Sequence, residues 1–153
     1  MGVDRVSGDE PVDTERLERL LCDALLRGQT PPIEALRTLR SVSWTHVVRS
    51  RLVAACYLAD KRLAEARKWA QRSVSIETTD GSWRLLLAIA DTERNRDGLL
   101  VSLAQLAALG DQAASVALAA VRVDPSTVAL KAAHRGLLAR PGWFPEWRSK
   151  TAR

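Results

Sequence analysis

Residues 52–59 constrain the fold more than any other stretch, because they form an apolar run without a charged side chain. A helix that is apolar on every side must be covered all round by neighbouring elements. After a polar turn at 60–62, small and apolar residues recur at helical spacing at Leu63, Ala66, Ala70 and Val74. The stretch 47–80 therefore predicts a helical hairpin whose first helix is central to the core.

The sequence resembles itself when it is shifted by about 34 residues. The shift places Val53 on Leu87 and Ala54 on Ala88, and size and polarity mostly survive it along the hairpin. Strand signals are absent, whereas Ala, Leu and Arg abound. We therefore expect an all-α fold, a stack of antiparallel helix hairpins (an α-solenoid) with about seven to eight helices.

Capping and turn residues divide the chain further. Asp13 or Thr14 is expected to cap the first helix, and Gly28 to end it. Ser43 should cap a helix starting at Trp44, and Ser82 one running over 83–91. Prolines at 31 and 32 should open the second helix, and further helices are expected over 99–109, 112–123 and 126–139.

The domain prediction follows from these boundaries. Residues 13–140 should form one helical repeat domain, preceded by a flexible acidic tail over 1–12. Residues 141–153 combine Trp143, Phe144 and Trp147 with a basic end. Either these rings cap the open end of the stack, or they bind a partner.

The sequence contains little that indicates catalysis or the binding of a metal or cofactor. No phosphate-binding loop, dinucleotide fingerprint, nucleophile elbow or zinc-protease motif occurs. His46 and His134 are far apart and lack a cluster of metal ligands, so no catalytic residue, metal or cofactor is predicted. Cys22 and Cys56 each lie in an apolar helical pattern, which favours two buried free thiols in a reducing compartment.

The central hairpin resembles the tetratricopeptide repeat. Its pattern of Trp, Leu-Gly and Tyr, then Ala and Phe, is met in identity by Tyr57 and Ala66 and in kind by Val53 and Ala54. Ser50, Ala70 and Thr78 depart from it. In that family, one face of each first helix lines a concave groove. Carried onto this chain, the resemblance implies a mostly apolar groove at Val48, Arg51, Ala55, Leu58, Leu85, Ile89, Ala117 and Val121.

Such a groove suits the apolar face of a partner helix. We therefore expect a non-catalytic, cytoplasmic adaptor or chaperone that binds another protein through an amphipathic helix, although the chain's own flanking segments would cover such a groove equally well. More narrowly, the stretches 51–66 and 83–109 look like the tetratricopeptide chaperones of type III secretion systems, which hold the needle subunit's terminal helix.

The alternative is a nucleic-acid-binding helical module, because the net charge is +5. It would use an arginine-rich surface in the middle of the chain, formed by Arg37, Arg40, Arg49, Arg51, Arg62, Arg67, Lys68 and Arg72. Self-association as a scaffold is a third hypothesis. No apolar run reaches the length of a membrane span, so no membrane partner is expected.

Overall fold

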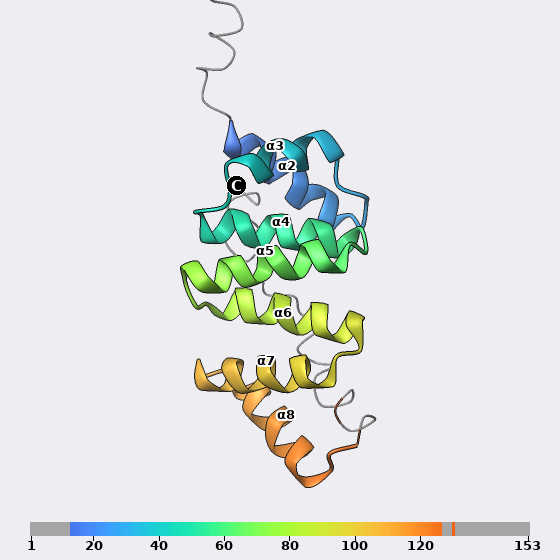
Figure 1. Ribbon diagram of the computed structural model, residues 1–153, viewed down its shortest axis with the longest axis vertical. Coiled ribbons are helices and arrows are strands. Elements are labelled where there is room, and N and C mark those ends of the chain that lie inside the picture. Colours follow the sequence, from blue (N-terminus) through green and yellow to red (C-terminus); the bar gives the residue numbers. More distant parts are fainter. Residues whose placement is uncertain (1–12, 127–129, 131–153) are drawn as a thin grey trace, which may run out of the picture.

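The computed structural model describes residues 13–126 and Leu130, and these residues form helices joined by short turns (Figure 1). The all-α prediction is confirmed, and no strand occurs among the described residues. Helices α4 to α7 lie side by side in chain order along the long axis (Figure 1). The helices are α2 (Thr14–Leu26), α3 (Ile33–Ser41), α4 (Val47–Ala59), α5 (Leu63–Ile76), α6 (Asp80–Glu93), α7 (Arg96–Ala108) and α8 (Gln112–Val123).

Side chains cap five of these helices by accepting the backbone N–H three residues later. Asp13 accepts from Arg16 at 3.1 Å, as its position predicted. Two predicted caps were wrong. Helix α4 begins at Val47 and is capped by His46, because Ser43 lies in a turn where its backbone carbonyl accepts the His46 N–H and its hydroxyl donates to a carbonyl of α3. The remaining caps are Thr79, Asn95 and Asp111.

The cap of α6 lies three residues before the predicted one. Thr79 Oγ1 accepts the backbone N–H of Ser82 at 3.2 Å, so the helix starts at Asp80. Ser82 lies inside the helix, where its hydroxyl accepts a hydrogen bond from Ser73 of α5 at 2.6 Å. The predicted capping serine therefore joins two helices instead of starting one.

Four of the described helices end in the same way. One residue takes the left-handed conformation and its N–H bonds to the carbonyl three residues earlier, while the N–H of the next residue bonds to the carbonyl five residues before it. Glycine takes this position at Gly28 (φ 67°) and Gly110 (φ 93°). Lys61 (φ 62°) and Arg94 (φ 57°) take it at the tips of the α4–α5 and α6–α7 hairpins. At both tips the next N–H bonds back to a carbonyl five residues earlier, at 2.9 Å. The two hairpins thus share one turn geometry.

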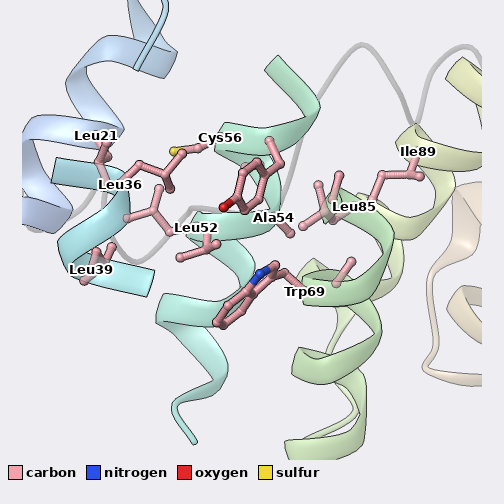
Figure 2. Close-up of a cluster of buried hydrophobic side chains, with 14 of the residues drawn as sticks. Leu21, Leu36, Leu39, Leu52, Ala54, Cys56, Trp69, Leu85 and Ile89 are labelled. Carbon is pink, nitrogen blue, oxygen red and sulfur yellow. The ribbon is translucent and has the colours of Figure 1, made fainter. Parts of the chain in front are cut away.

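Helix α4 is the centre of the first core cluster. Every residue from 50 to 57 is buried, as the apolar run predicted, whereas Leu58 is half-buried and Ala59 is exposed at the end of the helix. Figure 2 shows Leu52 and Cys56 of α4 among side chains of α2 and α3, with Trp69 and Leu85 on the other side. Four neighbouring helices therefore cover α4 all round.

A second cluster joins α6, α7, α8 and Leu130. Helix α6 supplies Leu87 and Ala90 to it, while its Leu85 and Ile89 belong to the first cluster. Helix α6 is therefore shared between two cores. Leu130 is almost completely buried there, so this side chain packs with those of α6, α7 and α8.

A partly buried ion pair fastens α8 to α6. The Arg84 guanidinium bonds both Asp80, at 2.7 Å, and the Asp111 carboxylate. Asp111 also caps α8 by accepting the N–H of Ala114 at 2.9 Å. The side chains of Arg84 and Asp111 are only 18% and 8% exposed, so solvent screens this pair weakly.

Several predictions fall outside the described residues. These are the tail over 1–12, most of the helix expected over 126–139, and the aromatic segment over 141–153. Within the described residues, no helix combines the length and the apolar character that crossing a bilayer requires.

The two cysteines give the first testable prediction. Both thiols are fully buried, and burial, with Cys22 as a neighbour, raises the pKa of the Cys56 thiol far above its ordinary value. Because only the thiolate is nucleophilic, the native protein should take up no iodoacetamide at pH 8 over minutes, and the protein in denaturant should take up two adducts per chain. Mass spectrometry measures both, and rapid labelling of the native protein would contradict the burial.

The second prediction concerns the Arg84 ion pair. Arg84→Met should lower the free energy of unfolding by about 1–3 kcal/mol, because it leaves the buried Asp111 carboxylate without its cation. Arg37→Met is the matched control, since it breaks a pair with Glu34 whose side chains are largely exposed, and it should change stability by less than about 0.5 kcal/mol. Urea unfolding of both variants gives the comparison, and equal losses would show that the Arg84 pair does not stabilise the fold.

Candidate functional site: a pocket between α5 and α7

The described residues form an open pocket of about 320 Å³ between α5 and α7, with α6 as its floor. We call it the α5–α7 pocket. Pockets that hold small ligands or single anchoring side chains begin at about this size. Its lining comprises Arg67, Gln71, Val74, Trp83, Leu86, Ile89, Ala90, Glu93, Asn95, Asp97, Gly98, Val101 and Ser102.

One end of the pocket is apolar. Antiparallel packing brings the C-terminal half of α5 next to the N-terminal half of α6, so Val74 and Trp83 lie at this end with Leu86. Val101 of α7 forms the facing wall and is 52% exposed, although Leu99 and Leu103, two residues before and after it, are buried. An exposed valine beside an apolar floor leaves a surface that a partner can cover.

The other end of the pocket is polar and lies at the α6–α7 turn. Arg67 of α5 pairs there with Glu93 of α6 at 3.2 Å, and the Glu93 side chain is only 17% exposed. Asn95 and Asp97 follow at the start of α7. Asp97 is exposed and forms no ion pair or hydrogen bond with another described residue. The pocket thus has an apolar end and an acidic end.

Trp83 has a buried polar group without a partner. Its Nε1–H is inaccessible to solvent and finds no hydrogen-bond acceptor, while the ring lines the pocket. Native proteins satisfy nearly all such groups, so a buried free N–H calls for an explanation. Among the described residues no acceptor lies within reach of this group, although the Trp83 ring lines the pocket.

The structure places the predicted groove residues differently from our expectation. Six of the eight are buried, and Val48 and Leu58 are half-buried. Ala55, Leu85 and Ile89 pack in the first core cluster, whereas Ala117 and Val121 pack in the second. Arg51, only 2% exposed, donates to Thr79 Oγ1 at 3.2 Å. Of the eight, Ile89 lines the α5–α7 pocket. The predicted groove lay along the first helix of each hairpin, whereas this pocket lies between α5 and α7, which are the second helices of their hairpins.

The basic residues of the alternative hypothesis all make contacts within the chain. Arg49 pairs with Glu18 at 2.9 Å, and Arg40 donates to the Tyr57 hydroxyl at 2.8 Å. Arg72 donates to the Trp44 carbonyl at 2.6 Å, and its guanidinium lies 4.8 Å from the centre of the Trp44 ring. Similar contacts hold the others, namely Arg37, Arg51, Arg62, Arg67 and Lys68. These contacts favour a structural role for the arginines.

Among residues 13–126 and Leu130, no three His, Cys, Asp or Glu side chains gather as metal ligands. His46 caps α4 through Nδ1, which accepts the Arg49 N–H at 3.2 Å. The pocket combines an apolar floor with a carboxylate rim, which is an arrangement for binding.

Comparisons of this chain with protein-family models, with curated proteins and with solved structures found no match. The tetratricopeptide-like resemblance therefore stays a prediction from the sequence.

The pocket was not predicted from the sequence, although one feature of α7 indicates it. Leu99, Leu100 and Val101 are three successive apolar residues in α7. Successive helical positions point about 100° apart, so neighbours that bury two of them leave the third exposed. Val101 is the residue left outside.

Proposed function

We propose that the protein is a non-catalytic binding module of tetratricopeptide-like type, which holds a helical segment of a partner protein in the α5–α7 pocket. The observation that carries this proposal is the open pocket itself, whose apolar floor on α6 continues to the exposed Val101. A helix binds such a hollow by inserting one or two apolar side chains from one of its faces.

The shape of the pocket supports a helix as the guest. Its lining on α6 extends from Trp83 to Glu93, which corresponds to about 15 Å at the rise of an α-helix. Its walls are α5 and α7, which each pack against α6. A guest helix lying over α6 between these walls would pack as a further helix does in a bundle. The volume of about 320 Å³ accommodates anchoring side chains, with the rest of the guest on the surface.

The narrower prediction of a type III secretion chaperone has no structural observation of its own. The resemblance in 51–66 and 83–109 carries it alone, and the cytoplasmic location likewise stays a prediction from the sequence. The nucleic-acid alternative is weaker than the binding of a helix, because the arginines that motivated it already have partners within the chain.

A synthetic helix tests the proposal. The probe is a crosslinked helical peptide of about 15 residues, with leucines at i, i+3 and i+4 and neutral polar residues elsewhere. Added to the ¹⁵N-labelled protein, it should shift the indole N–H signal of Trp83, which Trp83→Phe identifies. Val101→Asp should weaken binding about fivefold or more, since it removes about 1 kcal/mol of apolar contact and adds a charge.

Val116→Asp is the matched control for this experiment. Val116 is 68% exposed on α8 and does not line the pocket, so the same substitution should leave the affinity unchanged. Circular dichroism verifies that both variants keep their helices. Binding that survives Val101→Asp, or shifts that avoid the Trp83 signal, would show that the pocket is not the binding site.

A further inference from the structure

The α5–α7 pocket is polarised along its length, and this restricts the kind of helix it can hold. Antiparallel packing places Val74 and Trp83 at one end, while the Arg67–Glu93 ion pair and Asp97 lie at the other. A guest with one uniform apolar face would match the first end and leave carboxylates beneath apolar side chains at the second. Covering an unpaired carboxylate with apolar groups is unfavourable.

The charges at the polar end are not balanced within the pocket. Glu93 is neutralised by Arg67 at 3.2 Å, whereas Asp97 has no ionic partner among the described residues. Arg94 and Arg96 flank the same turn but do not line the pocket. The lining therefore carries one net negative charge in a chain whose overall charge is +5.

The spacing of the two ends fits an α-helix. Two turns of a guest helix, from position i to i+7, span about 10.5 Å, which fits within the roughly 15 Å of α6 that lines the pocket. Side chains at i and i+7 lie on the same face of a helix. One helix face can therefore reach both ends of the pocket.

Resting on the proposed function, we infer that the partner helix carries an apolar anchor and, about two turns away on the same face, a lysine or arginine. The anchor lies between Trp83 and Val101, and the cation meets the Asp97 carboxylate. The site thus favours a basic amphipathic helix, and the acidic rim disfavours helices with Asp or Glu at that position by like-charge repulsion.

Two probe peptides that differ at one position test this inference. Both are crosslinked helices with leucines at i and i+3, and one carries Lys at i+7 where the other carries Glu. Fluorescence anisotropy gives the two dissociation constants. The wild-type protein should bind the Lys peptide about two- to fivefold more tightly than the Glu peptide, which is the range of a solvent-accessible ion pair. The difference should shrink in 0.5 M NaCl.

Charge reversal in the protein provides the decisive comparison. Asp97→Lys should invert the preference, so that the Glu peptide binds more tightly. Glu34→Lys is the matched control, because Glu34 is also an exposed acid in the first turn of a helix, and its reversal changes the net charge equally. It should leave the preference intact. Asp97→Asn provides a milder variant that should abolish the preference without reversing it.

The outcomes separate the two proposals. If both peptides bind wild-type protein equally and shift the Trp83 signal, the selectivity for a basic helix is overturned and the proposed function stands. If Glu34→Lys alters the preference as much as Asp97→Lys, the effect is one of net charge, and the inference is again overturned. If neither peptide shifts the Trp83 signal, the pocket does not bind helices and both proposals fall.

Discussion

The double burial of α6 is the constraint on which the rest of the structure depends. Leu85 and Ile89 of this helix complete the core around α4, while Leu87 and Ala90 complete the core of α7 and α8. Two hydrophobic clusters that share one helix cannot be moved independently, because close-packed interiors transmit displacements. The position of α6 then fixes both walls of the pocket, since α5 and α7 each pack against it.

The fold was predictable because its strongest signals are local. The apolar run at 52–59 demanded a helix covered on all sides, and residues 50–57 are buried. Helix α8 begins and ends where its flanking residues indicated. The expected starts of α4, α6 and α7 were each misplaced by three residues. For α6 the cause is competition for a hydroxyl group, because Ser82 accepts hydrogen bonds from Ser73 and Thr79, and Thr79 caps the helix instead. For α4 the N–H of His46 bonds to the Ser43 carbonyl in a turn, and His46 caps the helix.

The site was much less predictable than the fold. The predicted groove depended on a face carried over from a resemblance, and the positions it selected, such as Leu85 and Val121, pack between helices. A sequence period identifies which residues share a helix face, but it does not reveal how far apart α5 and α7 lie over α6. The pocket arises from that separation, and only the surplus apolar residue Val101 reveals it in the sequence.

The hairpin tips at Lys61 and Arg94 have a consequence for thermal tolerance. Both residues hold a left-handed backbone that costs a side-chain-bearing residue roughly 1 kcal/mol, whereas the equivalent positions Gly28 and Gly110 hold it without that strain. Natural proteins often stay below the stability that their packing permits. A relative of this chain adapted to a hot environment would therefore be expected to place glycine at both tips and to leave the helices between them unchanged.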